Sequence, residues 1–132
     1  MEDMVTSLKY FCFANKLTVA VAESVTGGYL QYLLSAEENA SQFFQGGITA
    51  FNIGQKAKHL LVEPVHAQQC NCVSQQVADQ MALNVCTLFN CGLGIAVTGY
   101  AAPVPELGIT EMFAYYAVAL RGNIVLRHRI TA

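Results

Sequence analysis

The sequence has no tryptophan, only three prolines, and few charged residues, which make up 12% of its 132 positions. Its seven Lys and Arg residues are scattered and the formal net charge is −2, so we expect no nucleic-acid partner. No apolar run reaches the roughly 18 residues that a membrane helix needs. The acidic start, Met1-Glu2-Asp3, does not resemble a secretory signal. We therefore expect a cytoplasmic protein without a membrane partner.

Cysteine is present in an odd number, and most of the five cysteines fall inside apolar runs. Reduced cysteine in such a run behaves as a small hydrophobic residue. Cys70-Asn71-Cys72 holds the only close pair, and with His66 as the one nearby histidine it lacks the ligand count and spacing of a metal site. We expect neither a metal nor another cofactor.

Hydrophobic residues make up 54% of the chain, enough for one core, and we predict a single domain over residues 1–132. Apolar periodicity predicts several helices: residues 2–14 with Met4, Val5, Leu8, Phe11 and Cys12 on the buried face, about 26–35, a short one at Lys56, and about 74–90. The predicted strands are 17–22, 46–51, 94–99, 114–120 and 124–130.

This alternation predicts a layered α/β fold with a mixed sheet, helices packed on both faces, and a C-terminal β-hairpin that turns at Arg121-Gly122-Asn123. The wholly apolar stretch 94–99 is typical of a central strand.

The strand at 17–22 runs into the segment Ala22-Glu23-Ser24-Val25-Thr26-Gly27-Gly28 and then a helix. Such a turn places a hydroxyl, two glycines and free helix amides together, where negative charge is stabilised. Thr98 and Gly99 end a neighbouring strand, and ligands of α/β sheets bind at such strand ends. On local sequence alone, plain helix capping is the favoured interpretation of Ser24 and Thr26.

Four ordered motifs resemble those of the CinA C-terminal domain family. The segment 22–28 is similar to its AES-C-TGG signature, and 44–51 resembles its F-x-GG-x-x-A-Y strand, with Lys56 at the family's lysine position. Residues 73–82 are similar to VSEEVA-x-x-MA, and 96–103 to AVTG-x-AGP. The matches span nearly the whole chain.

The resemblance implies a metal-independent amidohydrolase that converts nicotinamide mononucleotide to nicotinate mononucleotide and ammonia, with Ser24 as nucleophile and Lys56 as base. We expect substrate contacts at Glu23, Thr26, Gly27, Gly28, Phe51, Thr98 and Gly99. Glu23 is expected to orient the lysine or the ribose, and Thr98 with Gly99 to bind phosphate. The amides of residues 25–28 are candidates for an oxyanion hole.

A lysine acts as a base near neutral pH only where burial or a positive neighbour lowers its pKa, and both burial and the nearby Lys58 are candidates here.

The chain departs from the family pattern at Phe51, which replaces a tyrosine, and in the loop 100–108, where a tyrosine and two prolines replace a glycine cluster. These departures leave open a catalytically weak or inactive nucleotide-binding or protein-interaction module, and an enzyme for a different small amide. Because the family pattern continues into a further helix beyond residue 132, one face of the final hairpin is expected to be bare, which favours a homo-oligomer.

Overall fold

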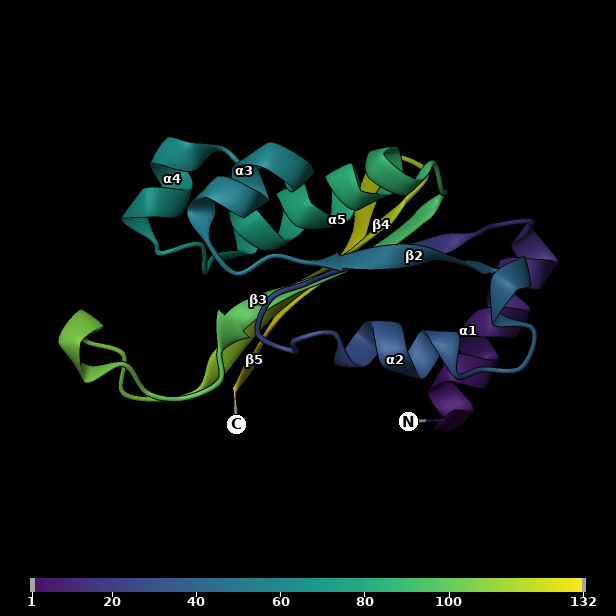
Figure 1. Cartoon of the computed structure of the whole chain (residues 1–132), viewed down its shortest axis with the longest axis horizontal. Helices are drawn as coiled ribbons and strands as arrows, with labels where there is room; N and C mark the ends of the chain where they lie inside the picture. The colour runs from purple at the N-terminus through teal and green to yellow at the C-terminus, as the bar shows by residue number, and fades with distance from the viewer. Residues whose placement is uncertain (1, 132) are drawn as a thin grey trace.

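Five strands form one mixed sheet in the order β2-β1-β3-β4-β5 in the computed structural model, which describes residues 2–131 (Figure 1). β1 is parallel to both β2 and β3, whereas β3–β4 and β4–β5 are antiparallel. The strands are β1 (Val19–Glu23), β2 (Phe44–Thr49), β3 (Leu93–Tyr100), β4 (Phe113–Leu120) and β5 (Asn123–Thr131). The mixed sheet, its C-terminal hairpin and the central position of β3 confirm the prediction.

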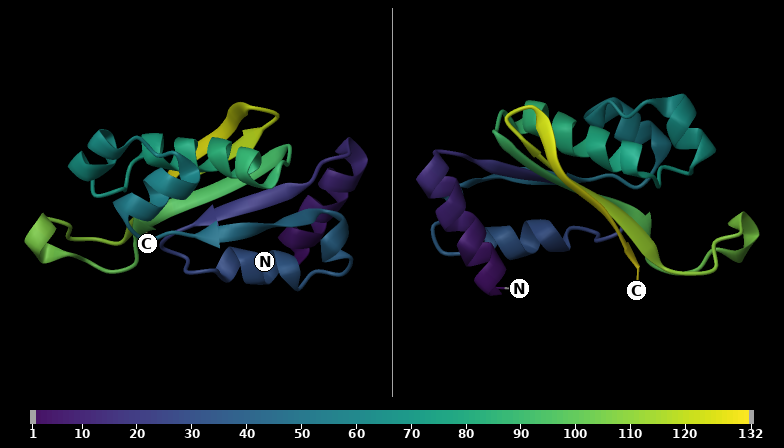
Figure 2. Two further views of the ribbon diagram at one scale, coloured as in Figure 1. Left: turned by 45° about the horizontal axis from the view of Figure 1, so that its top comes forward. Right: turned by 180° about the vertical axis from the view of Figure 1, so that it is seen from behind.

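Helices cover both faces of the sheet, as expected from the sequence. The helices are α1 (Glu2–Asn15), α2 (Tyr29–Ser35), α3 (Ile53–Leu60), α4 (Pro64–Gln69) and α5 (Gln75–Phe89), with short 3-10 turns η1 (Ala40–Gln42) and η2 (Pro105–Leu107). Figure 1 shows α3, α4 and α5 above the sheet and α1 and α2 below it, and the view from behind in Figure 2 agrees. No helix within residues 2–131 is both long and apolar enough to cross a membrane.

α5 packs directly on the central strand. Ser74 caps its first turn by accepting a hydrogen bond from the Val77 amide (3.1 Å), and Asn90 ends it in the left-handed conformation. A Cβ at Gly94 of β3 would lie 2.4 Å from the carbonyl oxygen of Ala82, so only glycine permits this close approach. The fully buried side chains on this face of α5 are Val77, Ala78, Met81, Ala82 and Val85.

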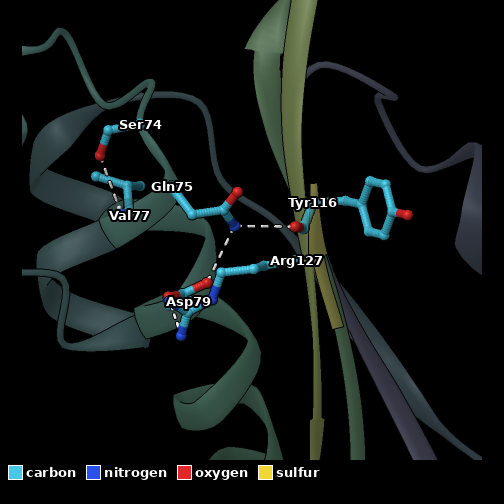
Figure 3. A network of polar contacts seen from close by, with 6 residues as sticks. All are labelled: Ser74, Gln75, Val77, Asp79, Tyr116 and Arg127. Carbon is cyan, nitrogen blue, oxygen red and sulfur yellow. Dashed lines mark hydrogen bonds and ion pairs between the residues drawn. The ribbon is translucent and has the colours of Figure 1, made fainter. Parts of the chain in front are cut away.

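Polar contacts also join α5 to the C-terminal hairpin (Figure 3). The Gln75 side-chain amide donates to the carboxylate of Asp79 and to the backbone carbonyl of Tyr116, each at 3.0 Å. Asp79 in turn pairs with Arg127 of β5 at 3.1 Å. The Tyr116 ring points to the opposite side of the sheet.

The buried face of α1 differs from the predicted one. Val5 and Cys12 are buried as expected, but Met4 and Phe11 are 68% and 44% exposed. Lys9 is buried instead, because its ammonium forms a 2.7 Å ion pair with Glu37 beyond α2. The ion pair with Glu37, which is distant in the sequence, therefore places Lys9 on the buried face of α1.

Other differences lie at element boundaries. α2 begins at Tyr29 rather than near Thr26, because Gly27 and Gly28 both have positive φ and hold the turn open. β1 begins two residues later than predicted, and β2 is shifted to Phe44–Thr49.

The short helix α4 was not predicted from the sequence. It is capped by the Glu63 carboxylate, which accepts hydrogen bonds from the amides of Val65 and His66, and it has proline at its first position.

Candidate functional site

A cavity of about 390 Å³ opens at the carboxyl ends of β1 and β3. Ser24 comes from the residue after β1, Lys56 from α3, and Gly99 and Tyr100 from the end of β3. The cavity is lined by Ser24, Phe51, Asn52, Ile53, Gly54, Lys56, Asn71, Cys72, Val73, Gly99 and Tyr100. The fold therefore brings Ser24, Lys56, Phe51 and Gly99 to one cavity.

Lys56 is only 1% exposed and contacts an uncharged partner. Its side-chain nitrogen donates to the hydroxyl of Thr98 at 3.1 Å, and that hydroxyl donates to the carbonyl of Cys72 at 2.6 Å. Burial lowers the pKa of Lys56 below the ordinary lysine value, because a charged amine is poorly solvated there. Burial, rather than the exposed Lys58, is the cause of this shift.

Thr98 does not line the cavity, although the sequence predicted that it binds phosphate. Its side chain is fully buried, and its hydroxyl already accepts from Lys56 and donates to Cys72. The side chain therefore holds the lysine instead of facing the cavity.

The carbonyl that receives Thr98 lies in an unusual turn between α4 and α5. Asn71 and Cys72 both adopt left-handed backbone conformations, with φ of 53° and 64°. The Cys72 amide donates to Ala67 at 2.7 Å, which fixes the turn. Burial raises the pKa of the Cys72 thiol, although nearby Lys56 acts in the opposite direction, so the sulfur is a protonated thiol and a weak nucleophile at neutral pH.

Ser24 is 6% exposed and lines the same cavity as Lys56. Within residues 2–131, its hydroxyl makes no hydrogen bond to the Lys56 amine, whose bond goes to Thr98. The Ser24 carbonyl accepts from the Gly27 amide at 3.1 Å, which closes the turn after β1.

Glu23 does not contact the lysine, contrary to one of the roles expected for it. The carboxylate is fully buried and accepts hydrogen bonds from the Thr26 hydroxyl at 2.6 Å and from three amides at the start of α2, those of Gly28, Leu30 and Gln31. Burial acts to raise the pKa of Glu23, but these hydrogen bonds outweigh it and hold the pKa below the ordinary value. Glu23 is the cap of α2 and does not line the cavity.

The same bonds limit the expected oxyanion hole. The amides of Gly27 and Gly28 are occupied by Ser24 and Glu23. Of the four amides of residues 25–28, those of Val25 and Thr26 have no acceptor within the described part of the chain. Thr26 borders a separate, mostly apolar cavity of about 240 Å³ instead of the one holding Lys56.

Phe51 and Gly99 line the cavity for different physical reasons. The Phe51 ring is 70% exposed at the start of the segment leading to α3, so it presents a free aromatic face. Gly99 pairs with Ala114 of β4, and a Cβ there would lie 2.4 Å from the Phe113 carbonyl oxygen. Close strand packing is therefore sufficient to explain glycine at 99.

Asn71 and Cys72 were not identified from the sequence as cavity residues. Asn71 donates from its side-chain amide to the Tyr100 hydroxyl at 3.2 Å. Tyr100 had a signal, because it lies in the loop 100–108 that departs from the family pattern, whereas Asn71 was hidden inside the Cys70–Cys72 segment. Its left-handed φ is a conformation that asparagine tolerates well.

Two arginines of β5 and His66 lie away from this cavity. Arg127 pairs with Asp79 and Arg129 with Glu111, each at 3.1 Å, and neither lines the cavity. His66 hydrogen-bonds to Ser74 at 2.8 Å. Among the described residues, no three His, Cys, Asp or Glu side chains are grouped in a way that could hold a metal ion.

Comparison with known proteins identifies relatives over most of the chain. The sequence model of the CinA C-terminal domain matches residues 1–124. A CinA-like protein from Synechocystis sp. is 44% identical over 86 residues, covering 65% of this chain and 21% of the relative. A CinA-like protein from Gemmatimonas aurantiaca is 37% identical over 126 residues, covering 93% and 29%. The chain spans about a fifth to a third of the length of these curated relatives.

Solved structures match the fold closely. A competence or damage-inducible protein from Enterobacter asburiae has a TM-score of 0.92 at 27% identity, covering 99% of this chain and 82% of that one. A competence-damaged protein (CinA) superfamily protein from Escherichia coli has a TM-score of 0.92 at 28% identity, covering 99% and 76%.

Proposed function

This chain belongs to the CinA C-terminal domain family, and we propose that it is a metal-independent amidohydrolase that converts nicotinamide mononucleotide and water to nicotinate mononucleotide and ammonia. The observation that carries the proposal is the presence of a serine and a buried lysine of lowered pKa in one cavity. A serine hydroxyl needs an adjacent base to become a nucleophile, and an amine that is neutral near physiological pH can supply it.

In the proposed mechanism, the neutral Lys56 amine accepts the Ser24 proton while the serine oxygen attacks the carboxamide carbon. The amide of Val25, the residue that follows the nucleophile, is the donor that we propose for the oxyanion that forms. The Lys56 ammonium then returns its proton to the nitrogen, the carbon–nitrogen bond breaks, and ammonia leaves a nicotinoyl ester on Ser24.

Water completes the reaction. Lys56 accepts a proton from the water as it attacks the ester, and the acid leaves as Ser24 regains its proton. Thr98 and the Cys72 carbonyl hold the amine in place throughout. The exposed Phe51 ring at the cavity offers a surface against which the flat pyridine ring can stack.

The reducing cytoplasm is the compartment that we propose for this activity. Among the described residues, all five cysteines are free thiols, which suits that environment.

A catalytically inactive nucleotide-binding or protein-interaction module is the alternative, and two observations favour it. The Lys56 amine is bonded to Thr98 rather than to Ser24, and Phe51 lacks the hydroxyl of the family's tyrosine. Such a module would bind the nucleotide or a protein partner without releasing ammonia.

The decisive test is ammonia release from nicotinamide mononucleotide by the metal-free protein. Ser24→Ala and Lys56→Met should each lower kcat by about a thousandfold or more, in line with losses of a nucleophile or its base in related catalytic units. Lys58→Met is the matched control, because Lys58 is exposed on the same helix, and its rate should stay near that of the unmodified protein.

Circular dichroism should show that all three variants are folded. Tight binding of the nucleotide without turnover would favour the inactive module. Turnover that survives Ser24→Ala would contradict the proposed nucleophile.

A further inference from the structure

We infer that the hydrogen-bonded pair of Asn71 and Tyr100 determines the size of the ligand, so that the site admits a mononucleotide and excludes a dinucleotide that carries the same carboxamide. This inference rests on the proposed function. It concerns two residues that the mechanism above does not use.

The argument begins with a second cavity next to the first. It has a volume of about 340 Å³ and lies between α4 and the loop that follows β3. Asn71 and Tyr100 line both cavities, and their side chains are joined by the 3.2 Å hydrogen bond. The bonded pair therefore belongs to the shared wall between the two spaces.

Neighbouring residues fix the positions of both Asn71 and Tyr100. The Tyr100 ring packs against Phe113 with ring centroids 5.4 Å apart. The Asn71 backbone is fixed by its neighbour Cys72, which donates to Ala67 and accepts from Thr98. Breaking the side-chain bond is thus the easiest way to open the wall, because the backbone on each side is anchored.

The second cavity has the chemistry to take a further nucleoside. Gln68 and Gln69 supply amide donors and acceptors, and Leu107 and Ile109 supply apolar surface. A base needs both kinds of contact, hydrogen bonds at its edge and apolar contact on its face. A dinucleotide whose nicotinamide ring reached Lys56 would extend from the first cavity toward the second, and the bonded pair, which lines both cavities and is exposed at the protein surface, lies in that path.

The test compares dissociation constants of nicotinamide mononucleotide and of nicotinamide adenine dinucleotide, measured by calorimetry on the full chain. We expect the unmodified protein to prefer the mononucleotide. Tyr100→Phe keeps the ring and removes the hydroxyl, and Asn71→Gly removes the amide while tolerating the left-handed φ. Each should reduce the preference about fivefold, the effect of one hydrogen bond.

The double variant should reduce the preference no further than either single change, because both remove the same bond. Tyr32→Phe is the matched control, since it removes an exposed tyrosine hydroxyl on α2 that lines neither cavity, and its preference should not change.

Each other outcome overturns the inference in a recognisable way. Binding of both nucleotides with a preference unaffected by Tyr100→Phe and Asn71→Gly would exclude the pair as the determinant while leaving the proposed function intact. Equal changes in the two dissociation constants would show a merely structural role. Binding of neither nucleotide would overturn the proposed function together with the inference.

Discussion

Lys56 combines nearly complete burial with a hydrogen bond to a neutral hydroxyl. An amine in this environment loses much of its hydration and gains no full negative charge in return, so the neutral form is favoured. Burial makes Lys56 a suitable base, and it also raises the free energy of the protonated form of the side chain.

This cost predicts the pH dependence of the reaction. Because the pKa of Lys56 is lowered by burial, kcat/KM should rise with pH and level off below the range in which an exposed lysine titrates. A pH–rate profile of ammonia release measures it. An inflection at the ordinary lysine value of 10.5 would contradict a buried neutral base.

Glu23 shows the opposite balance, in which hydrogen bonds overcome the effect of burial on its pKa. Glu23→Gln should lower the free energy of unfolding by about 1.5–3 kcal/mol at neutral pH, because an amide group replaces one of the accepting oxygens. A folded-state pKa below the unfolded value stabilises the protein above the unfolded pKa, and this contribution is lost as pH falls through the folded pKa.

Urea unfolding at several pH values tests this. The difference between the unmodified protein and Glu23→Gln should shrink as pH falls below about 4.5. Glu38→Gln, at an exposed position, should have little effect at any pH. A constant difference down to the acid limit would show that the carboxylate is not the source of the stability.

At the level of elements, the packing of α5 on β3 depends on the absence of a side chain at Gly94. Gly94→Ala should destabilise the protein by about 1–3 kcal/mol, because the new methyl group would meet the backbone of α5. Thermal unfolding measures the change.

Gly54→Ala in α3 is the control for that substitution. Its Cβ would have Asn52 at 3.5 Å as its nearest neighbour, an ordinary contact, and alanine favours a helix, so stability should stay equal or rise by up to about 1 kcal/mol. Equal effects of the two changes would disprove the role of close packing.

The elements were largely predictable because their signals are local. The alternation around Arg121-Gly122-Asn123 predicted the hairpin, and Ser74 marked the start of α5. The contacts of the site were not predictable in this way. Lys56 meets Thr98 at a separation of 42 positions, and no periodicity encodes such a pairing. The same holds away from the site, where the Lys9 amine donates to the backbone carbonyl of Glu38 at a separation of 29 positions.

The family-like motifs predicted Ser24 and Lys56 as site residues, but they did not predict which residues hold these side chains in place. Glu23 is an example. The sequence shows that it is next to the proposed nucleophile, but only the fold shows that its carboxylate accepts hydrogen bonds from the amides at the start of α2.

Across the whole molecule, the sheet is covered unequally. α5 lies over β4 and β5 on one side, and no described helix lies under them on the other (Figure 2). Leu126 and Ile130 of β5, which are 51% and 47% exposed, and Tyr116 of β4 lie on that side, the open sheet face. Apolar surface of this kind favours association.

We propose a second copy of the chain as the partner on the open sheet face, since one patch can pair with itself about a two-fold axis. Light scattering after size-exclusion chromatography should show a dimer at micromolar concentration, and Leu126→Glu should shift it to monomer by placing a charge in the interface. Val65→Glu, exposed on α4 across the sheet, should leave the dimer unchanged. A monomeric unmodified protein would refute the proposal.

The strand order also governs when the site comes into existence as the chain is synthesised. β1 carries Ser24 at its end and is made before its neighbour β3, which follows only after β2 and three further helices. Thr98, which holds Lys56, and Tyr100, which walls the cavity, both belong to that late strand. A nascent chain therefore carries the nucleophile before it has the means to hold the base, and the proposed catalytic centre cannot form until β3 has been made.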